Sequence, residues 1–214
     1  MTDEYQPYSD FGGFDLLKEL MSIITALDER KDPAYEASLR QTVPSSQKAH
    51  ATHTPEILNV VANWLRAHQD IYPDDLLQLC EALWTTAWRE ERIAAIKLIA
   101  GNERTMDTVE FELLRRWSAD VDNAEQIDLL AEVMGQLLLM HPRLIGRIEQ
   151  LAANYNEWQR RLALVTMIVA GRDFAWEAGL ERMVQRMKDD DEQAVQEAIT
   201  WARREIKQRE GAGA

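Results

Sequence analysis

Some charged and aromatic side chains break the amphipathic pattern of the helices expected to carry them. In the segment 157–170, a rotation of about 100° per residue places Arg161 inside the apolar stripe that contains Trp158, Leu162 and Val165. A cation without a partner is costly on such a face, so Arg161 requires an anion. Two anions fit: a carboxylate from an adjacent helix, or a phosphate group, whose oxygens match the guanidinium fork.

Asp128 is a carboxylate on an open helix face. The helix that follows Asn123 has one apolar side, and Asp128 lies opposite it with Ala124 and Gly135, where the side chains are small. This arrangement leaves Asp128 accessible. The alternative interpretation is an ordinary exposed acid near a helix N-terminus, stabilised by the helix dipole.

Trp201 lies about 120° from the centre of the apolar stripe of the last expected helix. A basic run follows it: Arg203, Arg204, Lys207 and Arg209. An aromatic ring flanked by cations suits a nucleic-acid backbone. Packing of the indole against another helix explains the same position equally well.

Several other chemistries have no support in the sequence. There is no nucleophile elbow, P-loop or dinucleotide-binding glycine motif. His50 and His53 lack a third ligand at metal-binding spacing, so we expect neither a metal nor a cofactor. The single Cys80 cannot close an intramolecular disulfide, and no apolar run reaches the length of a membrane span, so we expect a cytoplasmic chain.

The elements that position these residues all carry helical signals. Low Gly and Pro content, nine and six of 214 residues, fits a helical chain, and no alternating run predicts a strand. Thr54 is the expected N-cap of a helix with Pro55 at its first position. The stretch 32–53 is looser and predicts a linker. Helices are expected near 15–27, 54–68, 74–87, 89–100, 106–117, 123–140, 143–153, 157–170, 176–188 and 191–209.

The sequence also contains an internal repeat. The segment 91–99 matches 160–168 at an offset of 69, and 195–199 fits the same frame, so the period is about 35 with a further unit near residue 127. Paired helices at this period predict an α-solenoid of HEAT-like repeats, an alpha-alpha superhelix, over 54–209. Residues 1–53 are expected to pack on it as an N-terminal helix and linker, and 210–214 to form a disordered tail. Such a stack brings Asp128 and Arg161, one period apart, onto the same inner surface. A helical bundle with a chance internal similarity is the alternative.

Charge is distributed unevenly. The net charge is −13, and all of it comes from residues 1–142, whereas residues 143–214 contain 12 basic and 12 acidic residues. An acidic surface repels a polyanion unless cations gather on one face. If the chain binds DNA, we expect a continuous positive stripe that joins Arg160, Arg161 and Arg204.

Six groups of segments occur in a characteristic order and spacing: Thr54-Pro55-Glu56; Leu83-Trp84 with Arg89-Glu90 and Ala94-Ala95; Asn123 to Asp128; His141-Pro142 with Leu144-Ile145; Asn156 to Arg161 with Ala163; and Ala198 to Trp201 with Arg204-Glu205. Through these segments the chain resembles, from about Thr54 to Gln208, the AlkD-type bacterial DNA alkylation repair proteins.

This resemblance implies an alkylpurine DNA glycosylase that acts on N3- or N7-alkylated purines in duplex DNA, as a monomer on a concave helical surface. It carries the essential carboxylate over to Asp128, which would stabilise the sugar cation and direct a water molecule. Arg161 would contact the adjacent phosphate and Trp201 the deoxyribose, with Arg160, Arg204 and Trp158 in the DNA interface. The family's Asn-Trp-Asp segment reads Asn123-Ala124-Glu125 here, so one aromatic wall is absent at position 124. The alternative function is a non-catalytic scaffold whose acidic N-terminal part binds a basic protein.

Overall fold

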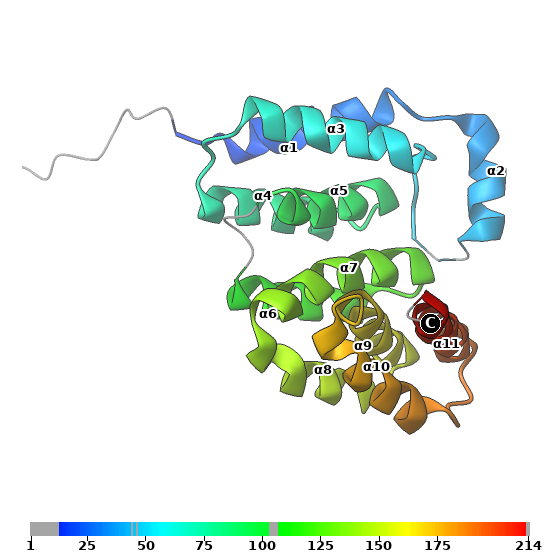
Figure 1. Ribbon diagram of the computed structural model, residues 1–214. Helices are drawn as coiled ribbons and strands as arrows, with labels where there is room; N and C mark the ends of the chain where they lie inside the picture. The colour runs from blue at the N-terminus through cyan, green and yellow to red at the C-terminus, as the bar shows by residue number, and fades with distance from the viewer. Residues whose placement is uncertain (1–12, 44, 46, 103–106, 213–214) are drawn as a thin grey trace, which may run out of the picture.

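The computed structural model describes residues 13–43, 45, 47–102 and 107–212, and this part of the chain is all-helical, as predicted (Figure 1). Two isolated bridges, Lys31–Thr52 and Lys48–Trp88, are its extended pairings. The α-helices are α1 (Leu16–Asp28), α2 (Pro33–Thr42), α3 (Thr54–Ala67), α4 (Pro73–Thr85), α5 (Arg89–Ala100), α6 (Thr108–Trp117), α7 (Ala124–Met140), α8 (Ile145–Ala152), α9 (Glu157–Ala170), α10 (Phe174–Met187) and α11 (Gln193–Ala212).

The helices form two rows in the stack that Figure 1 shows from α1 and α3 at the top to α10 at the bottom. One row contains α3, α5, α7, α9 and α11, and each of these helices contacts the next. The other row contains α1, α4, α6, α8 and α10. In this row α1 packs on α3, α4 on α5, α6 on α7 and α8 on α9, and α10 packs on both α9 and α11. We call the first row the inner row.

The inner helices begin at regular intervals. Their first residues are Thr54, Arg89, Ala124, Glu157 and Gln193, so successive starts lie 33–36 residues apart. This spacing agrees with the expected period, and α7 is the unit expected near residue 127. Their N-terminal ends therefore lie along one side of the stack.

Local caps determine where the inner helices begin. The side chains of Asn123 and Asn156 accept hydrogen bonds from the backbone N–H groups of Gln126 and Trp158, at 3.0 and 2.8 Å. The expected N-cap at Thr54 is one residue off, because His53 occupies the cap position and Thr54 is already helical. The Thr54 hydroxyl instead accepts a bond of 3.1 Å from the Arg89 guanidinium.

Two boundaries differ from the sequence prediction. The stretch 32–53 contains a helix, α2, where a linker was expected. Asp32 caps it by accepting from the Ala34 N–H at 2.9 Å, and Pro33 opens it. At the other end, α11 includes residues 210–212 of the expected tail, because Gly211 costs only about 1 kcal/mol in a helix. Residues 213 and 214 lie outside the described residues.

Helix α9 is the centre of the core. It contacts α7, α8, α10 and α11, and every residue from Arg161 to Ala170 is buried. It approaches α7 closely, since a Cβ atom added to Gly135 would lie 2.6 Å from Val169. A cation on this helix therefore needs a partner within the fold. None of the described helices has the length and apolarity needed to cross a bilayer.

Candidate active site and nucleic-acid interface

The structure brings Asp128 and Arg161 together across the α7–α9 interface. The Arg161 Nε and Nη2 atoms each donate to a different carboxylate oxygen of Asp128, both at 2.8 Å. Such a bidentate pair fixes the orientation of both groups. The expected side-by-side placement of these residues is confirmed, as is the carboxylate partner for Arg161.

The two partners differ in exposure. The Arg161 side chain is 7% exposed, whereas that of Asp128 is 31% exposed. The remaining Arg161 nitrogen, Nη1, donates to the Ala194 carbonyl at 2.7 Å and lies 3.6 Å from a Glu197 oxygen. Arg161 is thus enclosed by α7 and α11, and the carboxylate is the member of the pair that solvent reaches.

Further ion pairs connect the inner helices. Arg89 of α5 donates through Nε and Nη2 to both oxygens of Glu125 on α7, at 2.7 and 2.5 Å. Burial by itself would lower the pKa of Arg89, but the bond and the charge of Glu125 outweigh it and raise that pKa. Lys97 and Glu132 add a bond of 2.6 Å between the same helices. The Asp128–Arg161 pair is therefore one of several charged contacts between neighbouring helices of the inner row.

The expected positive stripe through Arg160, Arg161 and Arg204 does not form. Arg160 is only 15% exposed and donates to both oxygens of Asp190, at 2.6 and 3.0 Å. This bond is the main cause that raises the pKa of Arg160 and lowers that of Asp190. Carboxylates of neighbouring segments thus neutralise two of the three arginines, while Arg204 is exposed.

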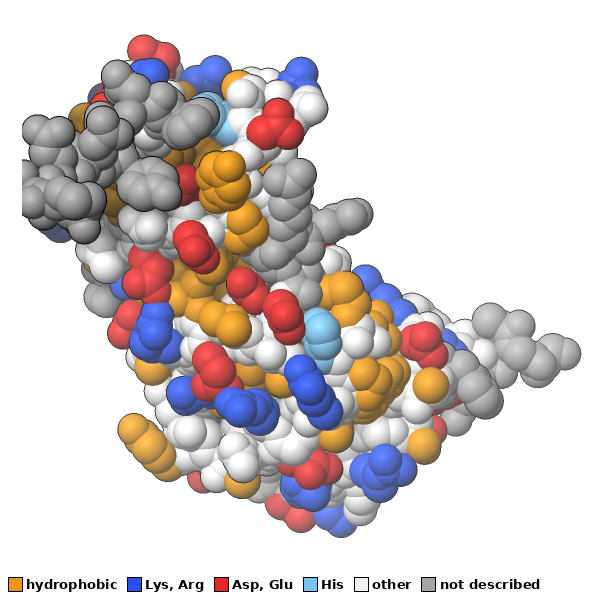
Figure 2. Space-filling view, turned by 90° about the vertical axis from the view of Figure 1, so that its left-hand side faces the viewer, with side chains coloured by type: hydrophobic (Ala, Val, Ile, Leu, Met, Phe, Trp, Pro, Cys, Tyr) orange, Lys and Arg blue, Asp and Glu red, His pale blue; other side chains and the backbone are white. Residues whose placement is uncertain are grey.

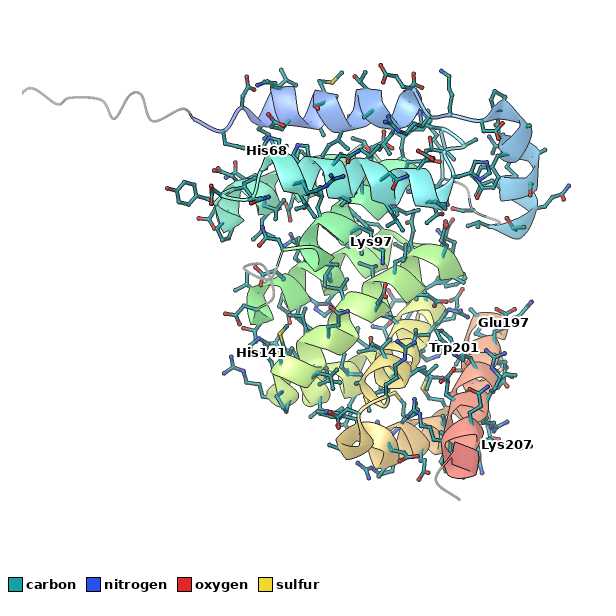
Figure 3. All side chains as sticks on the ribbon, turned by 45° about the horizontal axis from the view of Figure 1, so that its top comes forward. His68, Lys97, His141, Glu197, Trp201 and Lys207 are labelled. Carbon is teal, nitrogen blue, oxygen red and sulfur yellow. The ribbon has the colours of Figure 1, made fainter. Side chains whose placement is uncertain are left out.

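Three exposed cations, Arg203, Arg204 and Lys207, lie close together in sequence on α11. Within the described residues, no carboxylate lies within salt-bridge distance of Arg203, Arg204 or Lys207, and all three side chains are exposed. Figure 3 shows Lys207 on the same helix as Trp201 and Glu197. Trp201 is half-buried against the core, and its indole N–H donates to Glu205 at 3.0 Å. Packing of the indole against other helices, one of the two roles expected for Trp201, is thus observed.

A cleft of about 460 Å³ lies beside the pair. It opens between the first turns of α7, α9 and α11 and the C-terminal end of α2. Trp158 and Ala124 both line it, together with Ala194 and Glu197, which contact Arg161. Its lining residues are Thr42, Val43, Asn123, Ala124, Glu125, Glu157, Trp158, Glu192, Gln193, Ala194 and Glu197.

Sequence reasoning missed a buried acidic cluster at the start of α5. Glu90 is fully buried and accepts the backbone N–H groups of His50 and Thr52, at 2.9 and 3.2 Å. Glu91 lies 2.8 Å from the His50 ring, and burial raises the pKa of Glu91. In the sequence, this cluster is visible only as two adjacent acids, Glu90 and Glu91, in the first turn of α5. The cluster anchors the segment that leads into α3.

His50 and His53 each contact a carboxylate within the fold and do not share a common partner. His53 lies 3.2 Å from Asp32 and stacks on Tyr35, away from the partners of His50. Among the described residues, no group of three His, Cys, Asp or Glu side chains is placed to hold a metal ion.

The surface away from the cleft is mixed in charge. Figure 2 shows acidic and basic side chains interspersed with apolar ones on the face that lies to the left in Figure 1. This face shows no continuous basic surface.

One comparison with known proteins shows the family to which the chain belongs. The family model for the DNA alkylation repair enzymes matches residues 23–212, so the chain belongs to this family. No curated protein matches the chain. A solved structure described as a predicted DNA alkylation repair enzyme from Enterococcus faecalis is 18% identical, has a TM-score of 0.72 and is matched over 84% of each chain. That likeness shows a shared fold.

Proposed function

We propose that this chain is a HEAT-like solenoid that binds duplex DNA and hydrolyses the N-glycosidic bond of N3- or N7-alkylated purines. The observation that carries the proposal is the bidentate pair of a solvent-accessible Asp128 and an enclosed Arg161 beside a cleft on the inner row. Family membership supports the repair function. The regular spacing of the inner-row helices supports the solenoid. We further propose that the protein acts as a monomer in the cytoplasm.

The chemistry needs few groups. An N3- or N7-alkylated purine is already cationic, so it leaves without a strong general acid. A carboxylate placed near the sugar stabilises the developing oxocarbenium charge and orients the attacking water. In this proposal Asp128 is that catalytic residue. Arg161 acts as a positioning residue, because its three donor atoms hold Asp128, Ala194 and Glu197 rather than a free phosphate.

Phosphate contacts are assigned to α11. Arg203, Arg204 and Lys207 are exposed, and the guanidinium and ammonium groups suit phosphate oxygens. Trp201, between this basic run and Glu197, would pack on a deoxyribose. Arg160 would contribute indirectly, since its bonds to Asp190 hold the segment that leads into α11.

The decisive experiment measures free base. The purified protein is incubated with duplex DNA that contains N7-methylguanine, and the released base is quantified for the wild type and for Asp128→Asn. Asp74→Asn is the matched control, since Asp74 is an exposed acid in the first turn of α4. We expect release by the wild type and the control and none by Asp128→Asn. Absence of release by the wild type removes the enzymatic function.

A second candidate rests on a different observation. Four glutamates line the cleft, and among its described lining residues there is no Lys or Arg. A non-catalytic scaffold that binds a basic protein segment would use such a surface. Fluorescence anisotropy with labelled duplex DNA and with a labelled poly-lysine peptide separates the two. DNA binding that Arg204→Ala weakens supports repair, whereas tight binding of the peptide alone supports the scaffold.

A further inference from the structure

Helix α2 lies outside the two rows of the stack and is held by few contacts (Figure 1). Leu39 is its one buried residue, and in the described part of the chain no helix of either row forms an extensive contact with α2. A cavity of about 20 Å³, enough for one water molecule, lies between Leu39 and the inner-row residues Arg89 and Glu125. The C-terminal end of α2, at Thr42 and Val43, lines the cleft. A small displacement of α2 would therefore change the width of the cleft.

Two histidines hold the chain on both sides of α2. His53 lies 3.2 Å from the carboxylate of Asp32, which caps α2, and its ring stacks on that of Tyr35 with 3.9 Å between the centroids. His50 lies in the segment between α2 and α3. Its Nε2 atom is 2.8 Å from Glu91 of α5, and its Nδ1 atom is 3.6 Å from Asp28 of α1. Each ring thus connects a flank of α2 to a neighbouring segment.

His50 is surrounded mainly by carboxylates. The charged groups that face it come from three segments: Asp28, Glu90, Glu91 and Lys48. Lys48 is the most distant, because it lies 5.7 Å from the centre of the Trp88 ring on which His50 stacks. An imidazolium donates from both nitrogens, whereas a neutral ring turns one unprotonated nitrogen toward a carboxylate oxygen. His50 therefore holds its neighbours more firmly when the ring is protonated.

His53 faces one carboxylate and one phenol, those of Asp32 and Tyr35. The hydrogen bond with His53 is the main cause that lowers the pKa of Asp32, so this carboxylate favours a protonated ring beside it. The pair is about half exposed, with 47% of the His53 side chain accessible, and water weakens such a contact. His50 is therefore the stronger of the two attachments.

The contacts that follow α2 do not depend on a histidine. The Ser45 hydroxyl donates to Asp122 at 2.6 Å, and the side-chain amide of Gln126 donates to that of Gln47 at 2.6 Å. Histidine is the side chain that ordinarily changes charge between pH 5 and pH 8, so these two bonds persist over that range. They provide a pivot at the C-terminal end of α2.

We propose that His50 and His53 form a pH-sensitive clamp on α2, and that α2 pivots about Ser45 and Gln47 and widens the cleft when the imidazoles lose their protons. The held arrangement binds protons that the released one gives up. The clamp is therefore strongest below about pH 6 and weakens as the pH rises toward about 8. This inference concerns access to the cleft and does not depend on the proposed function.

Thiol labelling of the full chain measures the release of α2. Leu39→Cys places a thiol at the buried position of the helix, and Ala37→Cys places one at an exposed position of the same helix. Mass spectrometry identifies the labelled residue, which separates both from the buried Cys80. The ratio of the two labelling rates corrects for the effect of pH on the thiolate and reports how often α2 opens. We expect this ratio to rise about tenfold between pH 6 and pH 8.

Histidine variants in the same two chains assign the effect. His50→Gln should give a high ratio at both pH values, and His53→Gln should have a smaller effect of the same kind. Asp28→Asn keeps the His50 ring but removes one carboxylate that faces it, so the rise with pH should become smaller. His141→Gln is the matched control, because His141 lies near Asp107 at the opposite end of α7 and should leave the rise unchanged.

The proposal is overturned if the ratio stays constant or falls between pH 6 and pH 8, or if the rise is unchanged in His50→Gln. Circular dichroism at both pH values shows whether each variant is folded. If His50→Gln does not fold, Asp28→Asn decides the question, and a rise as large as that of the parent chain overturns the proposal.

Discussion

Replacing Asp128 with Asn should destabilise the fold more than replacing Arg161 with Met, although both substitutions break the same ion pair. In Asp128→Asn, a guanidinium that is 7% exposed loses its nearest countercharge and keeps its bond to the Ala194 carbonyl and the longer contact with Glu197. Breaking a buried pair in this way costs about 3–5 kcal/mol, and the partial exposure of Asp128 places the expected loss near the lower end. In Arg161→Met, the stem volume is kept and water hydrates the carboxylate, so the expected loss is about 1–2 kcal/mol.

Urea unfolding followed by circular dichroism measures both losses, and the double variant should reveal a coupling of about 1–2 kcal/mol. Glu132→Gln is the control, since Glu132 pairs with Lys97 but is 46% exposed and should cost less than about 1 kcal/mol. The reasoning fails if Arg161→Met costs more than Asp128→Asn, or if Asp128→Asn costs no more than the control.

Three further predictions concern the frame around the site. Gly135→Ala should cost about 1–3 kcal/mol in urea unfolding because its Cβ would lie 2.6 Å from α9, whereas Gly146→Ala, with open space around it, should cost nothing; equal effects would contradict the close approach. Burial raises the pKa of Glu91 above 4.5, so its stabilising contribution is full below pH 4.5 and is lost as the pH rises through the raised value. Glu91→Gln should therefore lose less unfolding free energy than the wild type as the pH rises above 4.5, and an unchanged pH slope would argue against burial as the cause. Burial also raises the pKa of the Cys80 thiol, so a thiol reagent should label Cys80 only at the rate of unfolding; rapid labelling of the folded chain would show an accessible thiol.

Local sequence patterns were sufficient to predict those features of the fold that each depend on a single helix. The apolar stripes placed the inner helices, and the misplaced cation at Arg161 correctly required an anion. The internal repeat then placed Asp128 opposite it, because an equivalent position one period away faces the same interface. These inferences need only periodicity and the cost of a buried charge.

Contacts between distant segments were not predictable in this way. Nothing in the sequence signalled the buried role of Glu90, because its hydrogen-bond partners lie about 40 residues earlier in the chain. The partner of Arg160, Asp190, likewise belongs to a loop 30 residues away. Helix α2 was missed because its start signals were present without a strong apolar stripe, and only Leu39 of this helix is buried.

The interfaces on the two sides of α7 have different mechanical properties. On one side, Gly135 and the enclosed Arg161 fasten α7 to α9 over an extensive apolar contact. On the other side, α7 meets α5 over a smaller contact, and the Lys97–Glu132 pair there is open to solvent. Dissolved ions screen exposed charges far more than enclosed ones. Added salt should therefore weaken the Lys97–Glu132 pair more than the enclosed Arg89–Glu125 and Asp128–Arg161 pairs, so that the contact between α5 and α7 loosens only at its exposed pair.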